Sequence, residues 1–96
     1  MNIKQVEYFL AACDGGTFTG AARELGVSVQ AVSKAVCELE REMGEPLFER
    51  TERGVTPTET GRQMRSRAAA FVASLRDLEA FMETGETPDV QAGALA

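Results

Sequence analysis

The feature that most constrains this sequence is a long helical run near its C-terminal end. Thr58 is a good N-cap residue, Glu59 suits the positive first turn of a helix, and Gly85 lies just past the end of the run. A helix of roughly 25 residues is about 38 Å long, so it extends beyond the small domain that precedes it. Its apolar residues are spaced by four, three, four, three and four positions, at Met64, Ala68, Phe71, Leu75, Leu78 and Met82. This heptad spacing predicts a seam that packs against a partner helix.

The length of the chain limits what can accompany that helix. At 96 residues there is room for one small domain, and a domain of about 60 residues buries only roughly 60% of its unfolded surface. Hydrophobic residues make up 44% of the chain and charged residues 26%, which is ordinary for a soluble globular protein. No apolar run approaches the roughly 18 residues of a membrane span, and the N-terminus lacks the apolar centre of a signal peptide. We therefore expect a cytoplasmic protein with no membrane partner.

Three shorter helices are predicted before the long one. The first has an apolar stripe with steps of three and four residues, and two consecutive glycines end it. Thr17 or Thr19 can cap a short second helix that ends at Gly26, and Ser28 can cap a third helix that ends at Gly44. The expected apolar faces are Ile3, Val6, Phe9, Leu10 and Cys13 in the first helix, Ala21, Ala22 and Leu25 in the second, and Val32, Val36, Leu39 and Met43 in the third.

The segment between the third helix and the long helix has a different pattern. Residues 45–61 are interrupted by Pro46, Gly54 and Pro57, which leaves no room for a helix. They predict two short strands joined by a turn near Arg53, which together form a small wing. The predicted fold is therefore mainly α: a winged helix-turn-helix of three helices and a two-stranded wing, followed by a long dimerisation helix.

The outer face of the third helix is the first candidate for a functional surface. In a helix-turn-helix, the second helix of the pair lies in the major groove of DNA with its N-terminal residues at the base edges. Gln can pair with adenine, Lys with guanine or a phosphate, and Ser with either a base or a phosphate. The alternative is that these side chains are only solvated, as polar residues on helix surfaces usually are. The outward positions are Gln30, Ser33, Lys34 and Cys37.

The charge of the chain counts against DNA binding unless it is unevenly placed. The formal net charge is −5 and histidine is absent, whereas a nucleic-acid binder usually carries a basic surface. DNA binding requires that the acids lie away from the DNA and that Lys34, Arg50, Arg53 and the helix N-termini meet the phosphates. The sequence favours this arrangement, because acids are absent between Gly26 and Cys37 and follow later in the helix. With so few cations, one subunit should bind DNA weakly, so a dimer would matter.

The order of these residues resembles the LysR-type transcriptional regulators of bacteria. The stretch YFLAACDGGTFTGAARELGVSVQAVSKAVCELEREMGEPLFERTERGVTPTETG is similar to the family's N-terminal winged helix-turn-helix, and the likeness runs from about residue 3 to residue 84. The resemblance implies three parts: a DNA-binding domain over 1–58, a linker and dimerisation helix over 59–84, and a flexible hinge over 85–96. A ligand-sensing domain follows that hinge in the family, so we expect this chain to be a fragment.

The resemblance also implies which residues act. Base or phosphate contacts fall on Val29, Gln30, Ser33 and Lys34 at the start of the third helix, behind the Ser28 cap, and wing contacts fall on Arg53 with Arg50 behind it. Val29 stands where the family usually has Gln, and a thymine methyl is its most plausible partner. The implied partners are double-stranded DNA and a second copy of the chain, with a tetramer as further assembly in a full-length protein. A small-molecule effector would act only through the domain that this chain lacks.

Three other functions can be weighed from the residues. A winged-helix dimerisation or protein-recruiting module without DNA binding is favoured by the acidic charge and by Val29. A redox sensor would use the outward Cys37 as a reactive thiolate, although no base lies beside it in the sequence. An enzyme has no basis, because the chain has no histidine, no pairing of a nucleophile with a base and no phosphate loop. Cys13 and Cys37 are far apart, so we expect no metal and no cofactor.

Overall fold

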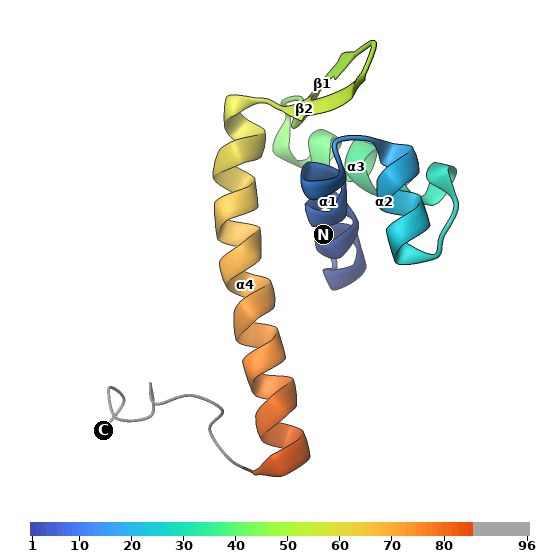
Figure 1. Cartoon of the computed structure of the whole chain (residues 1–96). Helices are drawn as coiled ribbons and strands as arrows, with labels where there is room; N and C mark the ends of the chain where they lie inside the picture. Colours follow the sequence, from blue (N-terminus) through green and yellow to red (C-terminus); the bar gives the residue numbers. More distant parts are fainter. Residues whose placement is uncertain (86–96) are drawn as a thin grey trace.

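The computed structural model describes residues 1–85 and has the predicted mainly helical architecture (Figure 1). A compact group of three helices carries a two-stranded wing at one end, and a single long helix runs beside and beyond that group. The predicted hinge over 85–96 lies outside the described residues from position 86 onward. The elements in chain order are α1 (Ile3–Gly15), α2 (Phe18–Leu25), α3 (Val29–Met43), β1 (Phe48–Thr51), β2 (Gly54–Pro57) and α4 (Glu59–Thr84).

Each helix begins at a side chain that accepts a hydrogen bond from the first turn. The Ser28 hydroxyl accepts from the backbone N–H of Ala31, and Thr58 caps α4 in the same way, as predicted. Of the two candidates for α2, the structure uses Thr17. The cap of α1 is Asn2, which was not predicted. Its side chain accepts from the backbone N–H of Gln5, and the side chain of Gln5 accepts from the backbone N–H of Asn2, which together form a capping box. These caps satisfy N–H groups that a helix leaves without partners.

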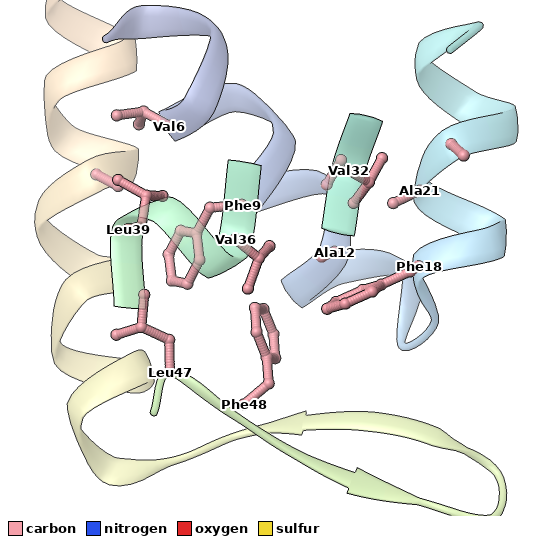
Figure 2. Close-up of a cluster of buried hydrophobic side chains, with 13 residues drawn as sticks. Val6, Phe9, Ala12, Phe18, Ala21, Val32, Val36, Leu39, Leu47 and Phe48 are labelled. Atoms are coloured by element: carbon pink, nitrogen blue, oxygen red, sulfur yellow. The ribbon is translucent and has the colours of Figure 1, made fainter. Parts of the chain in front are cut away.

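The core lies between α1, α2, α3 and the base of the wing. Phe9, Leu39 and Leu47 are almost fully buried there, and Figure 2 shows the surrounding side chains converging on this point from all three helices. The rings of Phe9 and Phe18 both pack on Phe48, with centroid distances of 5.5 and 5.7 Å. Most of the predicted apolar faces are buried.

The first residue of the stripe predicted for α1 and the last residue of the stripe predicted for α3 are not buried. Ile3 and Met43 are exposed, whereas Ala11 and Ala12 are buried. The buried face of α1 is therefore wider than the predicted stripe, because Ala11 and Ala12 belong to the core while Leu10 and Cys13 still pack against it. Ile3 and Met43 keep their apolar side chains outside the core and line an open groove beside α4.

The wing is fastened to the helices at both of its ends. Strands β1 and β2 pair antiparallel, with Phe48 opposite Pro57 and Thr51 opposite Gly54. At the far end, the N–H of Val55 donates to the carbonyl oxygen of Gly16, at 2.9 Å, in the turn between α1 and α2. Gly54 has φ +145°, and a Cβ there would clash with the same carbonyl oxygen, so the close approach requires glycine.

Helix α4 divides into a half that packs on the domain and a half that does not. Ala68 is buried, and Met64 and Val72 pack against the core, so the first part of α4 lies on its own domain. Further along, large apolar side chains with exposed fractions from 48% to 76% follow, at Phe71, Leu78, Phe81 and Met82. The predicted heptad seam therefore has two parts. Its first two positions, Met64 and Ala68, pack on the chain's own domain. No helix within residues 1–85 is long and apolar enough to cross a membrane.

Candidate nucleic-acid interface

An open groove of about 440 Å³ lies between the starts of α2 and α3 and the wing. It brings Val29 and Ser33 of α3 together with Arg50 of β1 and Arg53 of the wing turn. The two α3 residues precede the two arginines by 17 or more positions in the sequence. The hydrogen bond from the N–H of Val55 to the carbonyl oxygen of Gly16 holds the wing beside the start of α2. The wing and the starts of two helices therefore form one concave surface. The side chains from α2 that line it include Thr17, Phe18 and Thr19.

The predicted contact residues of α3 lie on one side of that helix. At 3.6 residues per turn, Val29, Gln30, Ser33 and Lys34 fall within an arc of about 140°. Val29 keeps 39% of its surface exposed and is not part of the core cluster, so it does not turn inward. Ser33 is half-buried in the wall of the groove, whereas Gln30 and Lys34 are exposed on α3 and do not line it. Ser28 is exposed as well, with its hydroxyl oxygen accepting from Ala31.

The arginines of the wing have different surroundings. The guanidinium carbon of Arg50 lies 4.9 Å from the centre of the Phe18 ring, so this side chain leans across the groove onto α2. Arg53 is exposed in the turn that joins the two strands. Lys34, Arg50 and Arg53 form no ion pair with any carboxylate of residues 1–85. Arg50 and Arg53 in the groove and Lys34 on the exposed side of α3 therefore keep their charge available for an anionic partner.

The acids of the third helix are used for other contacts. Glu40 accepts from the backbone N–H of Leu47 at 2.8 Å and so holds the base of the wing, and Glu38 accepts from Gln5 of α1 at 2.7 Å. Glu42 is paired with the N-terminal amino group, and Glu45 accepts from Thr60 of α4. Glu38 lies nine residues after Val29, or about 14 Å along the helix axis. The acids of α3 thus make their contacts away from the groove, and none of them lines it. Within residues 1–85, the acid that lines the groove is Glu52 of the wing turn.

The two cysteines differ in exposure. Cys37 is exposed on α3, and Cys13 is half-buried in α1. Burial raises the pKa of the Cys13 thiol to about 11, although the nearby Arg65 opposes the shift. Cys13 is therefore a neutral thiol at pH 7 and not a reactive one. Among residues 1–85, no group of three or more His, Cys, Asp and Glu side chains could hold a metal ion.

Some groove residues were not predicted from the sequence. The sequence predicts Thr17 or Thr19 only as a helix cap, and it predicts no role for Phe18. Their position beside the wing depends on the Val55–Gly16 hydrogen bond and on the packing of Phe18 against Phe48, which join segments about 30 to 40 residues apart. Only the local signal of a capped helix start, whose N–H groups favour anions, was available in the sequence.

Comparisons with known proteins agree with this geometry. The family described as bacterial regulatory helix-turn-helix protein, lysR family, matches residues 3–62. The nitrogen assimilation regulatory protein nac of Klebsiella aerogenes is 36% identical over 88 residues, which are 91% of this chain and 29% of that protein. The transcriptional regulator AbaB of Streptomyces antibioticus is 40% identical over 78 residues, covering 81% of this chain and 26% of that protein. This chain therefore spans less than a third of the length of these relatives.

A solved structure is similar over nearly the whole chain. In the complex of the BenM DBD with benA site 1 DNA, the protein superposes with a TM-score of 0.82 and 26% identity. The match covers 90% of this chain and all of that one. The family match extends over more than half of the sequence and includes α1, α2, α3, the wing and the start of α4. The chain belongs to the lysR family of bacterial regulatory helix-turn-helix proteins.

Proposed function

We propose that this chain binds double-stranded DNA at specific sequences, as the DNA-binding part of a bacterial transcription regulator. The observation that carries the proposal is the groove itself: the start of α3 and the wing arginines share one concave surface, while the acids of α3 are engaged elsewhere. The family match supports it, as does the likeness to a BenM DBD in complex with DNA. The site of action would be the cytoplasm, where bacterial DNA lies.

The geometry supports a division of labour between α3 and the wing. With α3 in the major groove, Gln30 can pair with adenine and Lys34 can reach guanine or a phosphate, while Val29 can contact only a thymine methyl. The hydroxyls of Ser28 and Ser33 are suited to phosphates near the helix start. Arg53, at the tip of the wing, would enter the adjacent minor groove or meet a phosphate. The base contacts would set the sequence and the remaining contacts would set the position.

We further propose that the chain acts as a homodimer through α4. Between residues 71 and 82, large apolar side chains of α4 are exposed to solvent, and a partner helix would bury them. An apolar groove of about 650 Å³ between α1 and α4, lined by Met1, Ile3, Met43 and Phe71 among others, extends this surface toward the domain. The partner helix would cover Phe71, Leu75, Leu78 and Met82, whereas Met64 and Ala68 also serve the chain's own domain. A tetramer and a small-molecule effector would involve parts of a longer protein that lie beyond this chain.

Selection of bound sequences from a random DNA pool tests DNA binding directly. A two-fold symmetric pair of half-sites should be enriched, because the symmetry of a dimer is repeated in its operator. Replacing Arg53 by Ala should weaken binding to every sequence and reduce the salt slope of log K by about one unit per subunit. Arg41→Ala, an equal loss of charge at the far end of α3, is the matched control and should change neither quantity.

The alternative function makes the opposite prediction. A dimerisation or protein-recruiting module would remain a dimer and yet enrich no DNA sequence above background. Its DNA affinity at moderate salt would be equal for the original chain and the Arg53→Ala variant. Either result would contradict the proposed function.

A further inference from the structure

A chain of aromatic rings leads from the core of the domain to the candidate interface. Phe9 of α1 packs on Phe48 of β1 with an interplanar angle of 54°, and Phe18 of α2 meets the same ring edge-on, at 84°. Phe18 is buried, and the guanidinium carbon of Arg50 lies over its ring, 4.9 Å from the ring centre. At the groove, the last ring of this chain, Phe18, therefore lies against the cation of Arg50.

The contact leaves the hydrogen-bonding capacity of Arg50 unused. A cation over a ring is held by the ring quadrupole, which engages no N–H donor. Within residues 1–85, Arg50 donates to no carbonyl or carboxylate, and neither Glu49 nor Glu52 pairs with it, although both are close in sequence. Its fork of donors, which suits phosphate geometry, stays open toward a groove that Thr17 and Thr19 also line.

Of the cations Lys34, Arg50 and Arg53, Arg50 is the one whose side chain packs on an aromatic ring. Arg53 is in a turn and Lys34 is on an open helix face, and neither contacts a ring or a carboxylate within residues 1–85. A long side chain loses rotamer freedom when it binds, and this loss weakens the contact that it makes. Stacking on Phe18 removes part of this freedom before DNA arrives.

We propose that Phe18 is a positioning residue for DNA binding: its ring holds the Arg50 guanidinium in the orientation that contacts a DNA phosphate. The partner is a phosphate rather than a base, because Arg50 projects from the wing strand onto α2 and not from the exposed face of α3. The inference rests on the proposed DNA-binding function and adds a residue that touches no DNA itself. Phe18 then has two roles, one in the core through Phe48 and one at the interface through Arg50.

A double-mutant cycle between Phe18 and Arg50 separates these roles. Phe18→Leu keeps an apolar residue in the core but removes the ring, and should weaken binding to a selected DNA site about 2- to 5-fold per subunit, as expected for a cation over an aromatic ring near the surface. The salt slope should remain unchanged, because the charge of Arg50 is still present. Arg50→Ala should lower that slope by about one unit per subunit. In the Arg50→Ala background, Phe18→Leu should have no further effect on affinity.

Phe9→Leu is the matched control, since it makes the same change in the same ring chain without a cation on the ring. It should lower thermal stability at least as much as Phe18→Leu while leaving the DNA affinity of the folded protein unchanged. Phe18→Tyr keeps the aromatic face and should retain the original affinity. Equal losses of affinity for Phe9→Leu and Phe18→Leu, or a Phe18→Leu effect that persists without Arg50, would overturn the proposal.

A measurement without any variant covers the case in which Phe18→Leu fails to fold. In the free protein, ¹⁵N relaxation of the arginine Nε–H groups should show a more ordered side chain for Arg50 than for Arg53. Equal order at the two positions would overturn the positioning role. This result does not depend on DNA, so it separates a failure of the Phe18–Arg50 contact from a failure of the proposed function, which would appear as an absence of any selected DNA sequence.

Discussion

The domain built from α1, α2, α3 and the wing and the distal half of α4 contain similar apolar residues but bury them very differently. In the domain, Phe9 and Leu39 are almost fully enclosed by neighbouring elements of the same chain. In α4, Phe81 and Leu78 remain about half exposed, although they belong to a regular helix. The difference shows that the first region has its own core, whereas the second has a face that nothing within residues 1–85 covers.

The boundary between the two regions lies within α4 and not at its start. Ala68 is buried against the domain, and Arg65 and Arg76 form exposed ion pairs with Asp14 and Glu7 of α1. Exposed ion pairs contribute about 0–1 kcal/mol each, so apolar packing near Ala68 is the main attachment. After Val72 and the Arg76–Glu7 ion pair, no further contact with the domain is seen within residues 1–85, and an isolated helical segment of this kind needs a packing partner to be stable.

The largest expected effect tests whether only the domain has a core. Phe9→Ala should lower the free energy of unfolding by about 3–5 kcal/mol, because it leaves a cavity beneath Phe48. Phe81→Ala, the same change on the exposed part of α4, should have little effect on a dilute monomer. Urea denaturation at low protein concentration measures both. Similar losses for the two variants would mean that α4 is part of the same core, and the comparison would fail.

The second prediction addresses the uncovered face. Leu78→Asp should shift the monomer–dimer equilibrium by about 100-fold or more, because each large apolar side chain removed from an interface costs about 1.5–3 kcal/mol and a dimer contains two. Leu78 is outside the core cluster, so the fold of the monomer should survive. Sedimentation equilibrium measures the shift. Ala73→Asp, on the opposite side of the helix from Phe71, should leave the mass unchanged. A monomer at high micromolar concentration for the original chain would refute dimerisation through α4.

The sequence predicted this architecture well where the signals are local. The caps at Ser28 and Thr58 and the glycines after the helices are short-range features, and the structure confirms them. The heptad pattern correctly indicated a helix that is apolar on one side, but it could not tell which seam positions face the chain's own α1. Met64 and Ala68 were assigned to a partner, yet they also pack on their own domain. That distinction depends on how far the domain extends along α4, which is a tertiary property.

The candidate interface shows the same limit. The start of α3 was predicted from its polar face and from a family resemblance, and the structure places Val29 and Ser33 in the groove. Phe18 was missed because its contact with Arg50 joins a helix start and a strand 32 positions apart. No periodicity in the sequence encodes such a contact. The resemblance identified Arg50, and only packing shows what holds it.

The third prediction sharpens the comparison by separating DNA recognition from assembly. Val29→Gln should change the preferred base at one position of each selected half-site, with a discrimination of about 1–3 kcal/mol, because Gln can pair with adenine where Val can contact only a methyl group. The change should leave the monomer–dimer equilibrium as it is, in contrast to Leu78→Asp. Site selection with the original and variant chains measures the preference. Identical motifs would mean that Val29 does not contact a base, leaving recognition to Gln30 and Lys34.

The smallest expected effect lies at the start of α4, within the region that packs on the domain. Glu59 accepts hydrogen bonds from Arg62 and Gln63, and the hydrogen bond from Arg62 is the main cause that lowers its pKa below the usual 4.5. A carboxyl group with a lowered pKa in the folded state stabilises the protein above its unfolded pKa, and this contribution disappears as pH falls through the folded value. The contribution is small because the group is fully exposed.

Glu59→Gln should therefore flatten the fall in the urea midpoint between neutral pH and pH 3 by a small but measurable amount. Arg62→Gln removes the main cause of the shift and should flatten the same part of the curve. Both variants should leave the monomer–dimer equilibrium unchanged, since neither residue lies on the exposed apolar face of α4. If the original chain and Glu59→Gln give the same pH curve, the start of α4 is held by the Thr58 cap and by packing alone, and the charge of Glu59 does not stabilise it.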